Sequence, residues 1–189
     1  MSLILERVSK KHRDIDKIKN LFNNAFPPKG KIPLWYLLYR TKLNCTEFLA
    51  IYDDDIFVGF TYVTTDNDLT LILFLAIDSN IRGKGYGTKV LDAIKKRYIS
   101  NRIILEIETI DKKAKNYEQR VKRKKFYIKN GYRDAEISIN LLGDIYDMLI
   151  LGEKVDIEEY YLLIKKFIGR ILYWIVGSIV ICKRTKKTL

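Results

Sequence analysis

Three glycines at alternate positions carry the clearest chemistry in this sequence. Gly83, Gly85 and Gly87 lie between an apolar run and a segment with helical periodicity. Glycine leaves room for a bulky anion to approach the backbone. The unpaired N–H groups at the start of the following helix attract negative charge. Arg82 and Lys84 add positive charge from within the loop, so the segment predicts a site for a pyrophosphate group.

The glycine spacing separates this loop from two common phosphate-binding motifs. A dinucleotide fingerprint requires G-x-G-x-x-G and a Walker loop requires G-x-x-x-x-G-K-[ST], and neither pattern occurs here. The loop matches R/Q-x-x-G-x-G/A through Arg82, Gly85, Tyr86 and Gly87. It thereby resembles the GNAT superfamily of N-acetyltransferases, whose members bind the pyrophosphate of acetyl-coenzyme A (acetyl-CoA) at such a loop. A plain glycine-rich turn between a strand and a helix is the alternative.

A second motif lies at the end of a basic helical segment. Phe126–Tyr132 reads F-Y-I-K-N-G-Y, which resembles the family's F/L-Y-x-x-x-G-F/Y segment. The resemblance implies that Tyr127 protonates the departing coenzyme A thiolate, a role that suits a positioned phenol. Arg123 and Arg120, where many members have alanine and asparagine, are expected to lower the pKa of Tyr127 if they approach it closely. Alternatively, Tyr127 is an aromatic residue that closes the core.

Two glutamates alternate on the expected strand 102–109. Residues two apart on a strand share a face, so Glu106 and Glu108 are expected to project together. Two neighbouring carboxylates can raise the pKa of one of them towards neutrality. Either glutamate could then act as the base for the acceptor amine, or both could instead pair with nearby lysines and arginines. Asp78 is a further candidate base, and no Cys/His/carboxylate cluster predicts a metal site.

The family resemblance also implies how acetyl-CoA would bind. The strand before the loop would pair with the pantetheine arm through its backbone, and the loop and helix start would hold the pyrophosphate. The implied cofactor-binding residues are Leu75, Ala76, Ile77, Arg82, Gly83, Lys84, Gly85, Tyr86, Gly87 and Thr88.

Positive charge is concentrated around these motifs. The chain has a net charge of +12, and residues 82–133 hold 17 Lys/Arg against 5 Asp/Glu. A basic surface attracts a polyanion such as coenzyme A. Nucleic acid is a rival for the same charge, but no aromatic-interleaved or helix-turn-helix pattern accompanies it, so no specific nucleic-acid partner is predicted.

The apolar periodicities predict alternating strands and helices. Their order, β-α-α-β-β-β-α-β-α-β-β, resembles the GNAT fold over Leu3–Leu151: an α+β class with a mixed, mainly antiparallel central sheet flanked by helices. We expect a GNAT domain over residues 1–152, with a helix and an apolar segment over 153–189 packed on the same single domain. The expected strands are 3–8, 46–52, 56–64, 69–77, 102–109, 132–140 and 145–151, and the expected helices begin near 14, 34, 88, 112 and 156.

Two helical regions bear on the acceptor and on the basic helix. The segment from Ala25 to Thr46 carries Trp35, Tyr36 and Tyr39, and it is expected either to form one wall of the acceptor site or to pack as an ordinary helix. The basic helix 112–129 is expected to bury a stripe on one face. The stripe residues are Ala114, Tyr117, Val121 and Ile128.

The C-terminal segment is not explained by the family. Ile171–Cys182 is apolar and basic residues follow it, but it is too short to span a membrane, which takes roughly 20 residues. We expect it to pack on the domain or on a second copy in a homodimer, with peripheral membrane contact as the alternative. The widely separated Cys45 and Cys182, and the polar start of the chain, predict a cytoplasmic protein with free thiols.

These observations predict an N-acetyltransferase. It would transfer the acetyl group of acetyl-CoA to a primary amine of a small molecule or peptide, by direct attack in a ternary complex. A non-catalytic module that binds coenzyme A is the first alternative, and a nucleic-acid-binding domain is the second.

Overall fold

The computed structural model describes residues 3–26, 32–141, 143–169 and 180–184. The chain forms two compact units, one of Met1–Thr65 with Ile72–Ile99 and one of Asp66–Leu71 with Ser100–Leu189. The α+β class predicted from the sequence is confirmed.

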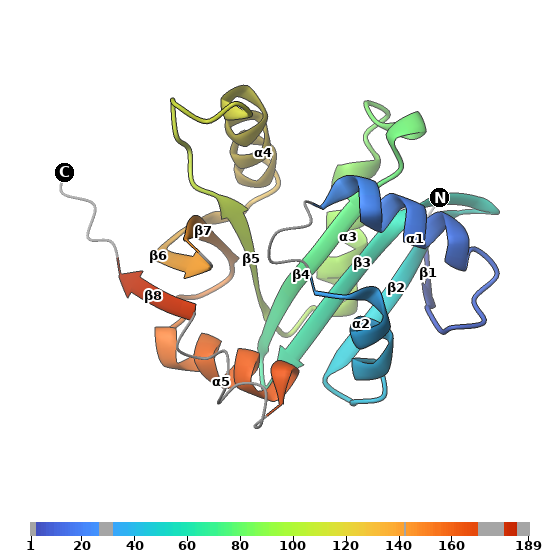
Figure 1. Ribbon diagram of the computed structural model, residues 1–189, viewed down its shortest axis with the longest axis horizontal. Coiled ribbons are helices and arrows are strands. Elements are labelled where there is room, and N and C mark those ends of the chain that lie inside the picture. The colour runs from blue at the N-terminus through green and yellow to red at the C-terminus, as the bar shows by residue number, and fades with distance from the viewer. Residues whose placement is uncertain (1–2, 27–31, 142, 170–179, 185–189) are drawn as a thin grey trace. The chain divides into compact units, whose positions relative to one another are not determined.

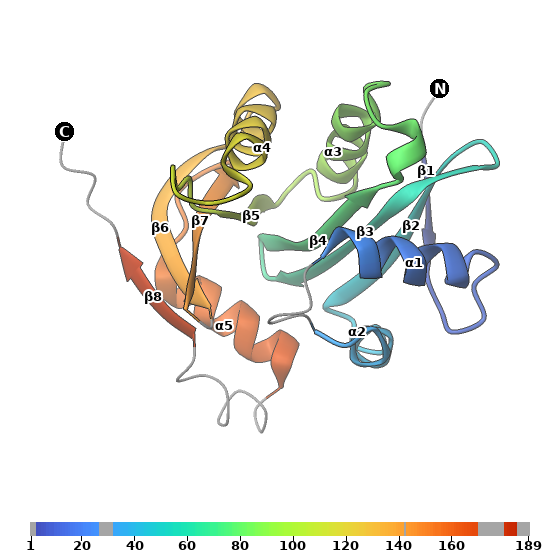
Figure 2. The ribbon, with the colours of Figure 1, turned by 45° about the horizontal axis from the view of Figure 1, so that its top comes forward.

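The first unit is an antiparallel sheet with helices on both faces (Figures 1 and 2). Helices α1 and α2 lie on one face, and α3 lies on the other. The strands follow chain order, and β1–β2 and β2–β3 pair antiparallel. Its elements are β1 (Ile4–Arg7), α1 (Ile15–Ala25), α2 (Leu34–Arg40), β2 (Thr46–Asp53), β3 (Ile56–Asp66), most of β4 (Leu69–Ile77) and α3 (Tyr86–Arg97).

An aromatic cluster fills the space between α1 and the sheet. Phe22 of α1 is buried, and its ring lies edge-on to Phe74 of β4, with ring centroids 5.3 Å apart. Phe60 of β3 lies 6.1 Å from the same ring and contacts Phe48 of β2. Burial of such rings, each removing a large apolar area from water, supplies much of the unit's hydrophobic stabilisation.

On the opposite face of β2, the carboxylate of Glu47 binds residues at the end of α3. Glu47 accepts hydrogen bonds from Arg97 at 2.6 and 2.9 Å, from Arg7 at 2.8 Å, and from the Tyr98 hydroxyl. Burial alone would raise the pKa of Glu47, but the hydrogen bonds from Arg97, Tyr98 and Arg7 outweigh burial and lower the pKa to about 2. Because the folded state holds the ionised form, this carboxylate stabilises the fold at neutral pH.

Glu47→Gln should lower the free energy of unfolding at pH 7 by about 2 to 3 kcal/mol, because hydrogen bonds to a charged group are lost from a partly buried site. A depressed carboxyl pKa stabilises the fold above the unfolded pKa. The difference between the two proteins should therefore shrink as the pH falls from the ordinary value of 4.5 towards about 2. Urea unfolding across this range measures it. Asp16→Asn, at an exposed carboxylate, is the matched control, and an equal loss there would contradict the account.

The second unit is an antiparallel sheet with two helices (Figure 1). Its strands lie in the order β5-β7-β6-β8, with antiparallel pairing throughout. The pairing of β5 with β7 keeps a continuous register, so Glu106 and Glu108 share one face as predicted. The elements are β5 (Arg102–Glu108), α4 (Tyr117–Lys129), β6 (Arg133–Leu141), β7 (Asp144–Leu151), α5 (Ile157–Ile168) and β8 (Val180–Arg184).

The predicted element order is confirmed through β7 and α5, but the start of α4 is wrong. The helix begins at Tyr117 rather than near Lys112. The Asp111 carboxylate accepts a hydrogen bond from the backbone N–H of Lys113 at 2.9 Å, which gives these residues a turn instead of a helical start.

The predicted apolar stripe on α4 is also wrong. Ala114 lies before the helix, and Ile128 is 46% exposed. None of the thirteen residues of α4, all of which the structure describes, is fully buried. Charge attaches the helix instead, because Lys124 donates to Asp134 at 3.0 Å and to Asp147 at 3.4 Å. The basic residues of α4 thus serve partly as structural ion pairs.

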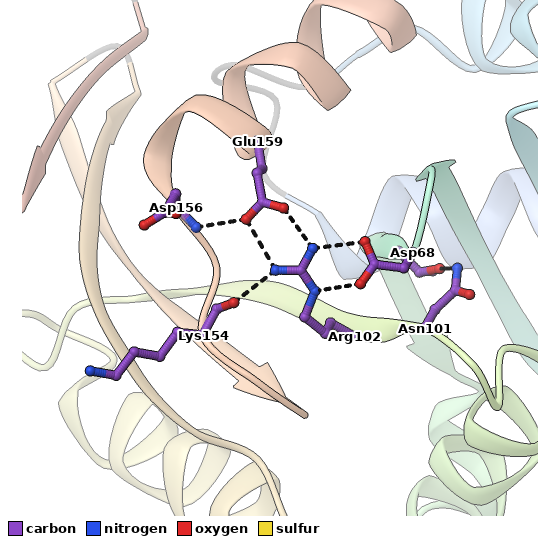
Figure 3. Close-up of polar contacts among 7 residues, drawn as sticks. Asp68, Asn101, Arg102, Lys154, Asp156 and Glu159 are labelled. Carbon is purple, nitrogen blue, oxygen red and sulfur yellow. Dashed lines mark hydrogen bonds and ion pairs between the residues drawn. The ribbon is translucent and has the colours of Figure 1, made fainter.

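Helix α5 begins at the predicted N-cap and is joined to β5 by hydrogen bonds from an arginine side chain. Asp156 forms a capping box with Glu159. Arg102 of β5 bonds both oxygens of Glu159 at 2.6 and 3.0 Å, both oxygens of Asp68 at 2.8 Å, and the Lys154 carbonyl at 2.7 Å (Figure 3). The planar guanidinium suits such paired contacts.

Arg102→Lys should lower the free energy of unfolding by about 2 kcal/mol, because an ammonium group cannot make two bidentate contacts at once. Arg133→Lys is the matched control, since Arg133 is exposed and makes one hydrogen bond, to the Gly152 carbonyl. Its effect should stay below about 1 kcal/mol. Urea unfolding compares the two variants, and equal losses would show that Arg102 is not a special attachment point.

The C-terminal segment is described only in part. Residues 170–179, which hold most of the apolar stretch Ile171–Cys182, lie outside the described residues. Val180–Arg184 forms β8 and pairs antiparallel with Ile137–Leu141 of β6, a strand that the sequence analysis did not predict. Within the described ranges, the helices are too short or too polar to cross a membrane.

Candidate functional site

The approach to the glycine loop is a tight turn after β4. Asp78 caps the short helix Ser79–Ile81 by accepting a hydrogen bond from the backbone N–H of Asn80 at 2.9 Å. The backbone N–H of Asp78 donates to the Val58 carbonyl at 2.9 Å. The Asp78 carboxylate therefore shapes the turn, which makes it a weak candidate for a catalytic base.

Two of the three glycines have left-handed backbone conformations. Gly83 has φ = 82° and Gly85 has φ = 79°, a region that other residues enter only with strain. A Cβ added at either position would meet no heavy atom within 4 Å, so both face open space. Gly85 is the N-cap of α3, whereas Gly87 is its second residue and has ordinary helical backbone. The turn alone therefore requires glycine at 83 and 85, but not at 87.

The start of α3 presents unpaired backbone donors. The N–H of Lys89 makes the first helical hydrogen bond, to the Gly85 carbonyl at 3.3 Å. The preceding N–H groups of Tyr86, Gly87 and Thr88 belong to the first turn, where helical geometry offers no partner. Such groups and the helix dipole favour an anion.

Side chains of the loop fix its shape as well as its charge. Arg82 donates from Nε to the Ile77 carbonyl at 3.2 Å, which ties the loop back to β4. The Tyr86 hydroxyl donates to Asp53 at the end of β2 at 2.8 Å, and the Lys89 ammonium lies 5.0 Å from the centre of the Tyr86 ring. The hydrogen bond to Asp53 raises the pKa of Tyr86. The sequence motifs did not point to Asp53, because it lies 33 residues before Tyr86 in the chain.

The strand implied in pantetheine binding is held closely by β3. Thr61 is buried and donates from its hydroxyl to the Phe74 carbonyl at 3.0 Å. A Cβ built on Gly59 would lie 2.1 Å from the Ala76 carbonyl oxygen. The backbone just before and within Leu75–Ile77 therefore has a fixed path that depends on a glycine and a threonine of the neighbouring strand.

In the second unit, the carboxylate of Glu108 is paired with arginine side chains. Its carboxylate accepts from Arg123 at 2.7 Å, pairs with Arg120 at 3.2 Å, and accepts from Asn116 at 3.1 Å. Of the two alternatives left open by the sequence, these contacts favour the role of arginine partner for Glu108. They also explain why α4 is more basic than the family motif.

Glu106 has a different environment on the same face of β5. It accepts a hydrogen bond from the Tyr160 hydroxyl of α5 at 2.6 Å, and no described cation pairs with it. Burial raises the pKa of Glu106, and the hydrogen bond from Tyr160 lowers it in part. The cause is burial rather than a neighbouring carboxylate, so the expected coupling with Glu108 is not the origin of the shift.

Tyr127 lies in an aromatic group at the end of α4. Its ring is edge-on to Phe126 and to Tyr132, with centroids 5.2 and 5.7 Å away. Burial raises the pKa of Tyr127, and Arg123 lowers it by a smaller amount. The expected net lowering by arginines is therefore wrong, because burial outweighs their charge. Tyr127 remains a protonated donor at neutral pH.

The aromatic segment of α2 is attached to the sheet and also carries exposed rings. Leu37 is buried, and its carbonyl accepts a hydrogen bond from the Tyr62 hydroxyl at 3.2 Å. Trp35 and Tyr39 are 66% and 55% exposed. The helix α2 therefore packs on the sheet and also presents aromatic rings to solvent, and a role as one wall of the acceptor site stays a prediction.

Comparisons with known proteins agree with these motifs. The model of a family described as an acetyltransferase (GNAT) domain matches residues 44–134, which include the glycine loop, both glutamates and Tyr127. The chain thus carries a GNAT acetyltransferase domain over this stretch. An uncharacterized N-acetyltransferase of Methanocaldococcus jannaschii is 25% identical over 156 residues, covering 80% of this chain and 92% of the relative.

Solved structures share the fold of this chain. A GNAT-family structure from Bacteroides thetaiotaomicron has a TM-score of 0.70 at 20% identity, and the match covers 90% of this chain and 98% of that one. An aminoglycoside 6'-N-acetyltransferase complexed with coenzyme A has a TM-score of 0.61 at 17% identity, with 81% and 99% coverage. Over the described part of this chain, no group of histidine, cysteine and carboxylate side chains has the arrangement of a metal site.

The glycine that is free of backbone strain gives the sharpest test of the loop. Gly87→Val should weaken acetyl-CoA binding about 10- to 100-fold, because a branched side chain would stand beside the helix-start N–H groups that are expected to meet the pyrophosphate. Gly87→Ala, which the family motif allows, is the matched control and should keep the affinity, and neither change should lower the melting temperature, since valine and alanine both favour helix over glycine. Equilibrium dialysis and thermal unfolding measure the two effects, and unchanged affinity in Gly87→Val would contradict the loop assignment.

Proposed function

We propose that this acetyltransferase moves the acetyl group of acetyl-CoA to a primary amine of a small molecule or peptide, by direct attack in a ternary complex. The observation that carries the proposal is the left-handed Gly83–Gly85 turn, which opens onto unpaired N–H groups at the start of α3. The match of residues 44–134 to an acetyltransferase domain supports it.

The loop would hold the diphosphate of the cofactor. The N–H groups of Tyr86, Gly87 and Thr88 would donate to its oxygens, with Lys84 and the outer nitrogens of Arg82 supplying charge. The backbone of Leu75–Ile77 would pair with the pantetheine amides. An aminoglycoside 6'-N-acetyltransferase with this fold is complexed with coenzyme A, which supports a coenzyme A site in this chain.

Glu106 is the proposed general base. An amine must lose its proton to attack the thioester carbonyl carbon, and a carboxyl group with a raised pKa accepts that proton near neutral pH. Glu108 is the poorer candidate because its carboxylate is already paired with two arginines. Its proposed role is to hold α4, which carries Tyr127, against β5.

Tyr127 is the proposed general acid. When the amine nitrogen bonds to the carbonyl carbon and the carbon–sulfur bond breaks, the leaving sulfur gains the electron pair. The Tyr127 hydroxyl would then give its proton to the thiolate. Its raised pKa keeps this proton in place at neutral pH.

The acceptor class is proposed from the exposed aromatic rings of α2. Trp35 and Tyr39 offer faces on which an ammonium or a ring could stack. An aminoglycoside, a polyamine and a short peptide with a free amino terminus are the first acceptors to test. We also propose a cytoplasmic location, which suits the free thiol of Cys45.

An acetyl-transfer assay that follows release of the coenzyme A thiol distinguishes the proposed roles of Glu106, Glu108 and Tyr127. Glu106→Gln and Tyr127→Phe should each lower kcat by about 10²- to 10⁴-fold with little change in the KM for acetyl-CoA. Glu108→Gln should mainly lower the melting temperature. If Glu108→Gln lost the rate while Glu106→Gln kept it, the assignment of the base would be reversed.

The alternative of a non-catalytic coenzyme A module gives a distinct result. Such a protein would bind acetyl-CoA, lose that binding in Gly87→Val, and release no thiol with any of the three acceptors. Acetyl transfer to one acceptor at a rate that depends on Tyr127 would exclude the module.

A further inference from the structure

We propose that Tyr160 of α5 is a positioning residue for Glu106, because its hydroxyl holds one carboxylate oxygen and leaves the other for the acceptor amine. The inference rests on the proposed function, since it takes Glu106 as the base. It adds to that function a residue beyond the part of the chain that matches the family model, which ends at residue 134.

The contact is short, and both of its partners are held in place. Tyr160 Oη donates to Glu106 Oε1 at 2.6 Å, and the Tyr160 side chain is only 3% exposed. Leu163 and Phe167, on the same helix, are buried as well. A hydroxyl on a buried ring has little freedom to leave its acceptor, so the orientation of the carboxylate is fixed.

A second contact between the same two elements fixes the position of Tyr160. Glu159, the preceding residue, accepts two hydrogen bonds from Arg102 (Figure 3). Arg102 lies on β5, four residues before Glu106. Strand β5 and helix α5 are therefore joined at two places, by Arg102 with Glu159 and by Glu106 with Tyr160. The first contact sets the register of the helix that the second one needs.

Among the charged and titratable neighbours of Glu106, Tyr160 is the group that offsets the effect of burial on its carboxylate. On β5, the Glu108 carboxylate forms ion pairs with Arg120 and Arg123. On β7, the pKa of Tyr146 is raised by burial and by carboxylates that include Glu106, so Tyr146 stays neutral. Burial favours the protonated form of Glu106, and the Tyr160 hydroxyl favours the ionised form.

Tyr160→Phe tests the contact by removing the hydroxyl and keeping the ring. Carbon-13 NMR of the glutamate carboxyl groups, with the Glu106 signal assigned by its loss in Glu106→Gln, reports the titration directly. The pKa of Glu106 should rise by about one to two pH units. The low-pH limb of acetyl-CoA hydrolysis, followed by thiol release without any acceptor, should move upward by the same amount, with the rate recovering at high pH.

Tyr98→Phe is the matched control, because it removes a tyrosine hydroxyl from a different carboxylate, Glu47. It should leave the Glu106 titration unchanged. An unmoved Glu106 titration in folded Tyr160→Phe, or a rate loss equal at every pH, would overturn the positioning role. If instead Glu106→Gln kept full acetyl transfer while the Tyr160→Phe shift appeared, the proposed base would fail although the contact was real.

Discussion

The attachment of α3 to one face of β2 is the constraint on which the proposed cofactor site depends. Glu47 and Asp53 lie near the two ends of β2, six residues apart, and therefore face the same side. Glu47 bonds Arg97 and Tyr98 at the end of α3, while Asp53 bonds Tyr86 at its start. The helix whose first turn would meet the anion is thus fixed at both ends. The remaining freedom lies in a turn that only glycine can form without strain.

The second unit uses charge to hold its helices. Glu108 attaches α4 to β5 through arginines, and Arg102 attaches α5 to the same strand. These pairs leave Glu106 as the carboxylate of β5 that no described cation neutralises, with a single tyrosine as its partner. The contrast explains how two glutamates on one face of a strand can differ in proposed role, because each contacts a different helix.

Local patterns in the sequence predicted the parts of the fold that depend on local physics. Strand bounds followed apolar runs, and the glycine loop was evident because its spacing is contiguous. The partner of Glu106 could not be predicted, since Tyr160 lies 54 residues further along the chain. The apolar stripe on α4 was wrong because ion pairs from β5, β6 and β7 replace apolar packing there. The pKa of Tyr127 was misjudged because sequence shows nearby charge but not burial.

Calorimetric titration of the unaltered chain with acetyl-CoA, at low and moderate salt, tests the central claim most directly. The account predicts saturable binding of one acetyl-CoA per chain, with an affinity that falls as salt screens the basic surface around the loop. The absence of binding at both salt concentrations would contradict it. The glycine turn would then be a structural feature only, and the proposed chemistry of Glu106 and Tyr127 would have no cofactor on which to act.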